Sequence, residues 1–365
     1  MKETVVIAMS GGVDSSVAAY LLKEAGYNVI GITMQIWQQD DSSAASSKSG
    51  CCGMTAVEDA RFVAHSLNIP HYVLNFKDLF RKKVIDYFAN EYMIGRTPNP
   101  CIACNRYVKW EHLFQKSMDY DAKYVATGHY AKIINCGERL SIAATPSAKD
   151  QSYALYNLNQ HQLAHTLFPL SKFDNKDEVR KLAAQKLGLR VAYKPDSQEI
   201  CFIPDDNHSK FLEKYFNAEL PKGNFVNENG DILGQHMGLG CYTIGQRKGL
   251  GSFGIPKFVK NIDYITKDIV LADNSSLFKD TMLVNDLNFM AKSDIKGELN
   301  CLGKIRYSHK AAPCTISHTN GTILCRFNEP QRAITPGQSA VFYDHNHNII
   351  CGGTINSLID TTATA

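Results

Sequence analysis

The sequence lacks any apolar run that approaches the roughly 18 residues of a membrane-spanning helix. Its first residues, Met-Lys-Glu-Thr, lead directly into a predicted core strand rather than a signal peptide. It also lacks a surplus of one charge, since the formal net charge is only +3 over 365 residues. We therefore expect a cytoplasmic protein with no membrane partner. Global charge gives no argument for a nucleic-acid partner, whose basic footprint would have to be local.

Internal repeats are not visible, and a secretory signal is missing although the chain contains 11 cysteines. Cysteines without a secretory signal argue against a disulfide framework and favour reduced thiols, some of them catalytic or metal-bound. The length allows a sizeable core and predicts two or three domains.

A glycine-rich stretch near the N-terminus is the first feature that carries chemistry. Residues 10–16 (Ser-Gly-Gly-Val-Asp-Ser-Ser) follow the apolar run 4–8 and precede a helical pattern over 17–25, which predicts a strand, a loop and a helix. Gly11 and Gly12 allow a sharp turn and a close approach of the backbone to a ligand, and the N–H groups that open the helix suit an anion. The stretch therefore predicts a phosphate site.

The composition of this loop narrows the kind of phosphate site. Ser10, Ser15 and Ser16 add hydroxyl donors, and Asp14 can cap the helix or hold a magnesium ion. The Gly-Lys-Ser/Thr ending of a Walker A motif is missing, so the loop has no lysine for the β- and γ-phosphates. A simpler alternative is that glycine and serine only make a tight turn between strand and helix.

The first 145 residues alternate short apolar strands with amphipathic helices. Alternation of this kind predicts a parallel, doubly wound α/β sheet whose ligands lie beyond the carboxyl ends of the strands. Residues 38–50 are polar and serine-rich, and we expect a mobile loop there. After the glycine loop at 10–16, we expect strands at 28–34, 71–75 and 123–127, and helices at 55–68, 78–92 and 107–117.

The second half has a different texture, with frequent glycines and short alternating segments. This pattern predicts a small linking domain followed by a β-barrel, and a disordered tail at 361–365. We therefore predict three domains, 1–210, 211–281 and 282–360. The expected strands are 230–234, 262–266, 269–272, 302–307, 321–327, 340–343 and 349–355.

Two cysteine segments add a second kind of chemistry. Residues 97–105 combine a double-proline turn with the pair Cys101 and Cys104. Because Cys104 lies just before the helix that we expect near residue 107, helix N–H dipoles would lower its pKa, which makes it a candidate nucleophile. Cys201 lies between Ile200 and Phe202, a setting that by itself predicts a core residue. The spacing does not show whether Cys104 and Cys201 meet.

Taken together, these motifs resemble those of the bacterial tRNA-specific 2-thiouridylases, which are members of the ATP pyrophosphatase (PP-loop) enzymes. The resemblance extends over nearly the whole chain and follows the order of the family. The matching segments are residues 10–16, 50–53, 97–105, 126–130, 149–153, 196–202, 242–251, 304–307 and 335–338.

The resemblance implies an adenine nucleotide alpha hydrolase-like domain, a small central domain and a C-terminal β-barrel that contacts tRNA. It implies that ATP, with Mg²⁺, adenylates the C2 oxygen of the wobble uridine 34, and that a cysteine persulfide then attacks C2. Cys201 would carry the persulfide, and Cys104 would form a disulfide with it as sulfur is transferred. The implied ATP contacts are Ala8, Met9, Ser10, Gly11, Gly12, Val13, Asp14, Ser15, Met34 and Gly128.

The implied partners are the anticodon stem-loop of a tRNA and a persulfide donor or relay protein fed by a cysteine desulfurase. Lysine and arginine attract phosphate, and tyrosine can stack on an unpaired base. Some members have Asp where this chain has Cys101, so we assign Cys101 to base contact only. The implied tRNA contacts are Asn99, Pro100, Cys101, His129, Lys149, Asp150, Gln151, Arg306, Tyr307 and Gln338.

Several alternatives remain open at this point. The chain is a different PP-loop ligase if it adenylates a carboxylate, or an RNA-binding protein without turnover if its thiols hold metal. Cys101, Cys104 and Cys201 offer three thiolates to zinc or an iron–sulfur cluster, although we predict no resident metal. Cys51 and Cys52 are interpreted as core or loop residues rather than a sulfur relay. The cysteines predicted to pack in strands are Cys136, Cys241, Cys301, Cys314, Cys325 and Cys351.

Overall fold

The computed structural model describes residues 2–36, 54–188, 192–193, 200–203 and 205–359. The predicted mobile loop at 38–50, Cys51, Cys52 and the tail at 361–365 lie outside the described residues. The chain forms two compact units, Met1–Val84 with Cys101–Asp206, and Ile85–Pro100 with Asn207–Ala365. The chain therefore leaves the first unit once and returns to it.

The first unit is built on a parallel sheet, which confirms the predicted α/β class. Its strand order is β3-β2-β1-β4-β7, and every neighbouring pair is parallel. The chain passes from β1 to β2 and β3 on one side and later to β4 and β7 on the other, so the strand order reverses between β1 and β4. The strands are β1 (Thr4–Ala8), β2 (Asn28–Gln35), β3 (His71–Asn75), β4 (Tyr124–Ala126) and β7 (Thr166–Leu167).

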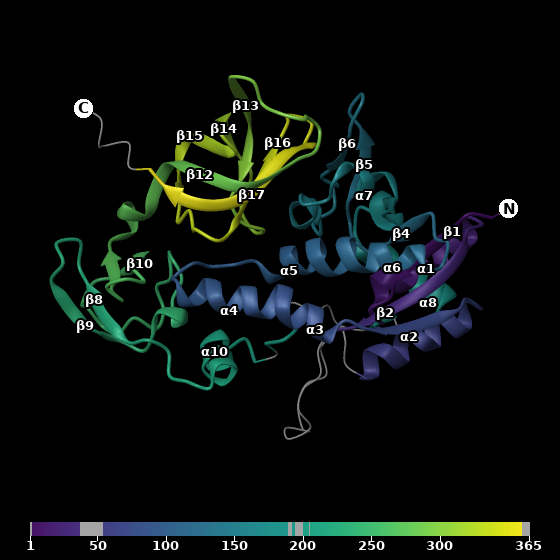
Figure 1. Ribbon diagram of the computed structural model, residues 1–365, viewed down its shortest axis with the longest axis horizontal. Coiled ribbons are helices and arrows are strands. Elements are labelled where there is room, and N and C mark those ends of the chain that lie inside the picture. Colours follow the sequence, from purple (N-terminus) through teal and green to yellow (C-terminus); the bar gives the residue numbers. More distant parts are fainter. Residues whose placement is uncertain (1, 37–53, 189–191, 194–199, 204, 360–365) are drawn as a thin grey trace. The chain divides into compact units, whose positions relative to one another are not determined.

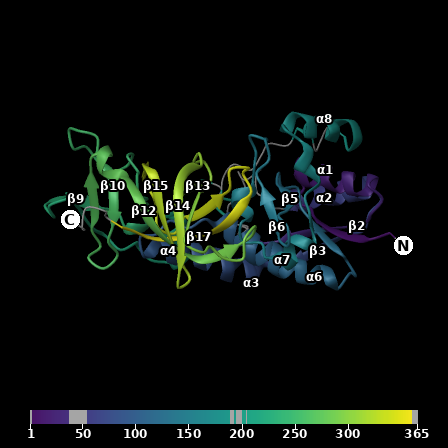
Figure 2. The same ribbon diagram turned by 90° about the horizontal axis from the view of Figure 1, so that it is seen from above.

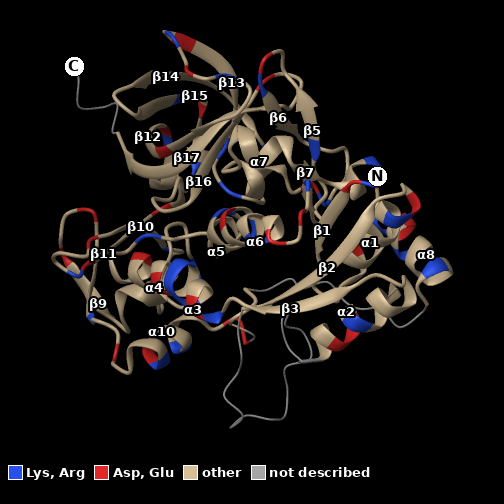
Figure 3. Cartoon of the chain, turned by 45° about the vertical axis from the view of Figure 1, so that its right-hand side comes forward, with Lys and Arg blue, Asp and Glu red and all other residues tan. Residues whose placement is uncertain are grey.

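Three helices share one apolar core with this sheet. They are α1 (Val13–Glu24), α2 (Met54–Ser66) and α8 (Lys176–Lys186), and Figure 1 shows them around the sheet. Val5 and Ile7 of β1 are fully buried against Val17 of α1 and Val179 of α8. Acidic and basic positions are interspersed along α2 and α8 in Figure 3, as expected for helices with a solvated face. The central strand and the helix that follows the glycine loop are thus fixed by the same core.

The helix predicted near residue 107 begins earlier, at Pro100. It runs as α5 (Pro100–Ala103), the π-helix η3 (Cys104–Leu113) and α6 (Phe114–Met118). Proline favours the first helical position because its φ is preset and its missing N–H needs no partner there. Cys104 therefore lies beyond the first turn, where the helix dipole has weakened, and the prediction of a cysteine just before a helix start is wrong.

The helix predicted at 78–92 is divided in the same way. It comprises α3 (Lys77–Phe80), the π-helix η2 (Arg81–Ile85) and α4 (Asp86–Met93). The other elements of the first unit are β5 (Lys132–Asn135), β6 (Leu140–Ala143), η4 (Ser152–Leu155), α7 (Gln160–Ala164) and η5 (Pro169–Lys172).

The second unit contains α4 and α10 (His208–Phe216), joined by a Phe88–Phe211 ring contact at 6.2 Å. Its small sheet has the order β10-β11-β8-β9. The predicted strand at 262–266 is wrong, because Asp263 accepts backbone N–H bonds from Ile265 (2.8 Å) and Thr266 (3.2 Å) and turns the chain. The elements are β8 (Gly223–Val226), β9 (Ile232–His236), η6 (Leu239–Cys241), β10 (Phe258–Ile262), β11 (Ile269–Ala272) and η7 (Asn274–Leu277).

A closed six-stranded barrel, in the order β12-β15-β14-β13-β16-β17, confirms the predicted C-terminal fold (Figure 2). Cys301, Cys314, Cys325 and Cys351 are buried in its core, as predicted. Cys241 lies in a 3₁₀-helix and Cys136 follows β5, so the strand prediction is wrong for those two. The strands are β12 (Phe278–Phe289), β13 (Glu298–Lys304), β14 (Ala312–Thr319), β15 (Thr322–Arg332), β16 (Ser339–Tyr343) and β17 (Ile349–Leu358). Over the described parts of the chain, the helices are all too short or too polar to cross a membrane.

Candidate functional site

The loop after β1 and the loop after β4 meet where the strand order reverses. Open α/β sheets bind ligands at this position. Two glycines make this meeting possible. Gly11 has φ +67°, and a Cβ there would lie 2.3 Å from the Ala56 carbonyl oxygen of α2. A Cβ on Gly128 would lie 2.7 Å from backbone atoms of Asp14 and Ser15 in the first turn of α1. The chain therefore needs glycine at both positions to bring these backbones together.

The serines of the loop fix its shape. The Ser10 N–H donates to Ser15 Oγ (3.2 Å), and the hydroxyls of Ser15 and Ser16 donate to the Gly12 carbonyl oxygen (3.1 and 2.8 Å). At Gly12 the nearest atom to an added Cβ is Ser10 Oγ, at the ordinary contact distance of 3.4 Å. The position at Gly12 is thus bordered only by the Ser10 hydroxyl at the start of a helix, a setting that fits a phosphate group.

The other predicted nucleotide contacts differ in how deeply they are buried. Ala8, Met9 and Val13 are at most 8% exposed, so their side chains are packed inside the protein. Met34 is half-buried near the carboxyl end of β2. An arrangement in which mainly backbone groups meet the ligand explains why glycines and small residues fill this motif.

Asp14 is engaged at both carboxylate oxygens. The Tyr130 hydroxyl donates to Oδ1 (2.8 Å), and the Lys176 ammonium group, from the start of α8, donates to Oδ2 (2.8 Å). Among the described residues no group of three or more His, Cys, Asp or Glu side chains has the arrangement of a metal site. Asp14 therefore does not fit the role of a magnesium ligand in this arrangement, because a cation would have to displace Lys176.

His129, which follows Gly128, lies among aromatic rings. Its ring centroid is 5.6 Å from that of Trp110 and 6.3 Å from that of Phe168, and its Nδ1 shares a 2.7 Å hydrogen bond with Thr127 Oγ1. Burial, and secondarily the nearby Lys109 cation, hold the pKa of His129 well below its usual value. The imidazole is therefore neutral near pH 7 and acts as a hydrogen-bonding group rather than a cation.

Lys109 was missed by the sequence analysis. Its ammonium group donates to Asn105 Oδ1 (2.8 Å), and Asn105 Nδ2 donates to the Ala154 carbonyl oxygen (2.9 Å). The four-residue spacing of Asn105 and Lys109 was the available signal. The bonds tie η3 to the segment that follows Gln151.

The predicted tRNA contacts at 149–151 differ in exposure and bonding. The Asp150 carboxylate accepts from the Thr145 N–H (2.9 Å) and the Ser152 hydroxyl (2.7 Å), and Gln151 Oε1 accepts from the Tyr130 N–H (3.0 Å). Lys149 is exposed. Asp150 and Gln151 thus shape the loops of the site, and Lys149 is the member of the triplet that extends toward solvent.

Three cysteines of the two predicted motifs differ in exposure. Cys101 is exposed, and Cys104 and Cys201 are half-buried. Phe202 packs edge-on against Phe80 of α3, with ring centroids 5.8 Å apart, and α3 lies against η3, which begins at Cys104. The apolar neighbour of Cys201 therefore anchors its segment to the helices beside Cys104.

In the second unit, the segment before Asn99 and Pro100 is held by the barrel. The Thr97 N–H donates to the Pro336 carbonyl oxygen (2.9 Å), and Gln338 Nε2 donates to the Thr97 carbonyl oxygen (2.9 Å). Residues 97–98 and the motif at 335–338 are thus partners in space, which their separation in sequence did not reveal. Gln338 supports the proline turn rather than extending from the barrel.

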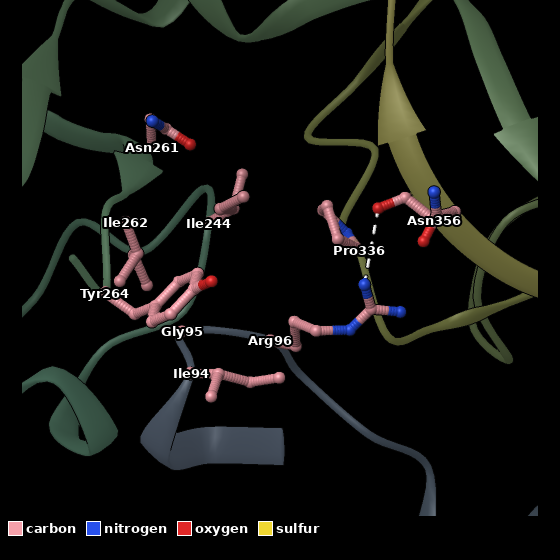
Figure 4. Close-up of a pocket in the computed structure, with 9 residues that line it drawn as sticks. All are labelled: Ile94, Gly95, Arg96, Ile244, Asn261, Ile262, Tyr264, Pro336 and Asn356. Carbon is pink, nitrogen blue, oxygen red and sulfur yellow. Dashed lines mark hydrogen bonds between the residues drawn. The ribbon is translucent and has the colours of Figure 1, made fainter.

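A pocket of about 350 Å³ lies beside this junction (Figure 4). Arg96 forms one wall, where it pairs with Glu91 (2.8 Å) and donates to the Ile355 and Asn356 carbonyl oxygens (3.2 and 3.4 Å). These bonds fix the end of α4 against β17. The lining residues are Ile94, Gly95, Arg96, Ile244, Asn261, Ile262, Tyr264, Pro336 and Asn356.

The other two predicted barrel contacts, Arg306 and Tyr307, lie after β13. Arg306 Nη1 donates to the Arg332 carbonyl oxygen (3.2 Å), which holds the loop, whereas Tyr307 is 46% exposed. The Lys304 ammonium group lies 5.6 Å from the centroid of the Tyr307 ring. A cation beside an exposed ring suits an unpaired base with its phosphate.

Comparison with known proteins identifies the family. The sequence matches family models described as "tRNA methyl transferase HUP domain" (residues 3–205), "tRNA methyl transferase PRC-barrel domain" (209–273) and "Aminomethyltransferase beta-barrel domain" (279–355). A protein of Lachnoclostridium phytofermentans named "tRNA-specific 2-thiouridylase MnmA" is 54% identical over 96% of this chain and 99% of its own. A protein of the same name from Clostridium kluyveri is 50% identical over 98% of this chain and 100% of its own.

The chain belongs to the tRNA-specific 2-thiouridylase family. The 2-thiouridylase resemblance predicted from the motifs is therefore confirmed, and so is the order of a HUP domain, a small β-domain and a barrel. Members of the 2-thiouridylase family are enzymes that modify tRNA, as their name states.

Proposed function

We propose that this chain transfers sulfur to C2 of the wobble uridine 34 of tRNA in an ATP-dependent reaction. The observation that carries the proposal is 54% sequence identity to a protein named as a 2-thiouridylase, over nearly the full length of both chains. The backbone cradle at Gly12 and the half-buried cysteines Cys104 and Cys201 supply chemistry that such a reaction needs. ATP is the substrate that fits the cradle, through its phosphates.

The first step activates a poor electrophile. The C2 oxygen of uridine attacks the α-phosphorus of ATP, pyrophosphate leaves, and AMP becomes a good leaving group on C2. Backbone N–H groups around Gly11 and Gly12 and the hydroxyl of Ser10 hold the phosphates. Neutral His129 and the backbone at Gly128 and Met34 complete the nucleotide and base contacts. Magnesium would arrive with the nucleotide, since Asp14 already pairs with Lys176.

The second step transfers sulfur. The terminal sulfur of a persulfide on Cys201 attacks C2, the Cys104 thiolate attacks the inner sulfur, and AMP leaves as the S–S bond of the persulfide breaks. The product is 2-thiouridine with a Cys104–Cys201 disulfide, which a cellular thiol reduces with two electrons. We propose a persulfide donor or relay protein, fed by a cysteine desulfurase, as the source of sulfur.

The tRNA contacts follow the same proposal. Asn99, Pro100 and Cys101 would meet the extruded base, and Lys149 and Tyr307 would meet the anticodon stem-loop. Asp150, Gln151, Arg306 and Gln338 would shape the surfaces that carry those contacts. We also propose the domain division 1–210, 211–281 and 282–360.

The test is mass spectrometry of tRNA nucleosides after incubation with ATP, Mg²⁺ and a persulfide donor. The wild type should produce 2-thiouridine, and both Cys104→Ser and Cys201→Ser should produce none. Cys136→Ser is the matched control, because Cys136 is also half-buried, and it should retain activity. If 2-thiouridine persists without Cys201, the persulfide assignment is wrong.

Methyl transfer is the second candidate, because two of the family models are described by that reaction. The same digest would contain a methylated nucleoside when S-adenosylmethionine is supplied, and it would not require either cysteine. Pyrophosphate release that depends on tRNA separates thiolation from methyl transfer and from a ligase that adenylates a carboxylate. Pyrophosphate release without tRNA would favour that ligase.

A further inference from the structure

The glycine loop lacks the lysine of a Walker A motif, yet a lysine from a distant part of the chain lies beside it. Lys176 is the first residue of α8 and is 162 positions from Asp14 in sequence. Its ammonium group contacts Asp14 Oδ2 at 2.8 Å, in the first turn of the helix that follows Gly12. The contact is partly shielded from water, with side-chain exposures of 14% for Lys176 and 28% for Asp14.

We propose that Lys176 is the cation of the phosphate site and takes the place of the missing loop lysine. This inference rests on the proposed use of ATP. Lys176 contacts the negatively charged pyrophosphate portion of the nucleotide while Asp14 holds its ammonium group at the loop. An ammonium group has three N–H donors, so one ammonium can bond a carboxylate and a phosphate oxygen together.

The surroundings of Asp14 favour this role over a merely structural ion pair. The Tyr130 hydroxyl already bonds Asp14 Oδ1, and Tyr130 itself is 2% exposed. Tyr130 follows Gly128 and His129 in the loop after β4. Its bond to Oδ1 therefore fixes the Asp14 carboxylate from that loop, while Oδ2 accepts from Lys176. Asp14 and Tyr130 therefore act as positioning residues that direct Lys176 toward the loop.

The backbone that carries Lys176 is also held in place. Val179 and Ala183 of α8 are fully buried in the core that also contains Val17 and Ala18 of α1. Asn175 caps α8 through a 3.0 Å bond from the Glu178 N–H to its Oδ1. Lys176 thus extends from a helix that is rigidly attached to α1, and its position does not depend on the ligand.

The experiment measures binding of three ligands to the full chain in the absence of tRNA and of magnesium. Lys176→Met should weaken ATP and pyrophosphate at least about tenfold each, because a charged hydrogen bond is lost, and should leave adenosine unchanged. Lys176→Arg keeps the charge and should restore most of the affinity. Lys181→Met, an exposed lysine of the same helix, is the matched control and should bind all three ligands as the wild type does.

Two outcomes would overturn the proposal. Equal affinity of wild type and Lys176→Met for pyrophosphate would overturn the proposal. Loss of adenosine affinity in parallel with pyrophosphate affinity would show a structural ion pair and overturn it as well. Thermal unfolding of each variant monitors the fold. Because no tRNA or sulfur is present, failure of the thiolation assay leaves this measurement intact, and failure here leaves thiolation intact.

Discussion

Gly12 is a position at which one added side chain would separate nucleotide binding from folding. Its backbone has φ −91° and ψ 164°, an extended conformation that any residue adopts. The first atom that an added Cβ meets is Ser10 Oγ at 3.4 Å. Gly12→Val therefore places methyl groups in the phosphate cradle without a backbone clash.

We expect Gly12→Val to abolish ATP binding and tRNA-dependent pyrophosphate release while tRNA affinity stays within about twofold. The thermal midpoint should change little, since no buried contact is lost. Gly234→Val is the control, because a Cβ at Gly234 meets no atom within 4 Å and lies outside the loop. Normal pyrophosphate release from Gly12→Val would contradict the phosphate assignment.

At the scale of elements, the junction between residues 97–98 and the turn at 336–338 positions the chain before the predicted base contacts. Gly337 has φ +92°, and a Cβ there would lie 2.9 Å from the Thr97 N and 3.0 Å from the Thr97 O. Gly321 has φ +75° but meets no atom within 4 Å. Alanine at either glycine would be strained by the positive φ, but only at Gly337 would its Cβ also clash with neighbouring backbone atoms.

Gly337→Ala should detach residues 97–100 from the barrel and lower the rate of thiolation, whereas Gly321→Ala should cost only about 1 kcal/mol of stability. Hydrogen exchange of the Thr97 amide measures detachment directly, because this N–H donates to the Pro336 carbonyl oxygen. Equal exchange rates in the two variants would show that the junction does not depend on close approach.

The helices of this protein also show that apolar spacing predicts the centre of a helix better than its ends. The apolar spacing of 107–117 located the centre of a helix correctly, but Pro100 set its start and η3 altered its winding. A π-helix shifts the faces of a helix, so 3.6-residue periodicity describes such a segment poorly. The consequence was specific, since Cys104 moved from a helix start into a helix.

At the scale of the whole molecule, histidines that are fully or partly buried make stability depend on pH. The pKa values of His71, His129, His236 and His309 all lie below the usual value, and burial is the largest cause for each. His236 is 2% exposed, so burial disfavours its charged form and lowers its pKa even though the Lys267 carbonyl oxygen accepts a hydrogen bond from its Nε2 (2.8 Å). Its Nδ1 accepts from the Gly238 N–H (3.0 Å). Protonation at Nδ1 would break the second bond.

A lowered pKa in the folded state means that the unfolded chain binds more protons below about pH 6.5. Stability should therefore be full above that pH and fall as the pH drops toward about 5, by at most about 1.4 kcal/mol per histidine and pH unit. Urea unfolding across this range measures the effect. His236→Gln should reduce the slope, and the exposed His345→Gln should not. A slope unchanged by His236→Gln would contradict the role of burial.

The sequence by itself determined the phosphate loop, the alternation of strands and helices, the barrel and the family, because local patterns and motif order are written along the chain. Only the tertiary structure decided that Lys176 meets Asp14 and that Gln338 supports Thr97. These contacts join residues more than a hundred positions apart, and no local periodicity relates such pairs. They arise because packing of α8 on α1, and of the barrel turn on the proline segment, places side chains that the sequence presents only as a surface lysine and glutamine.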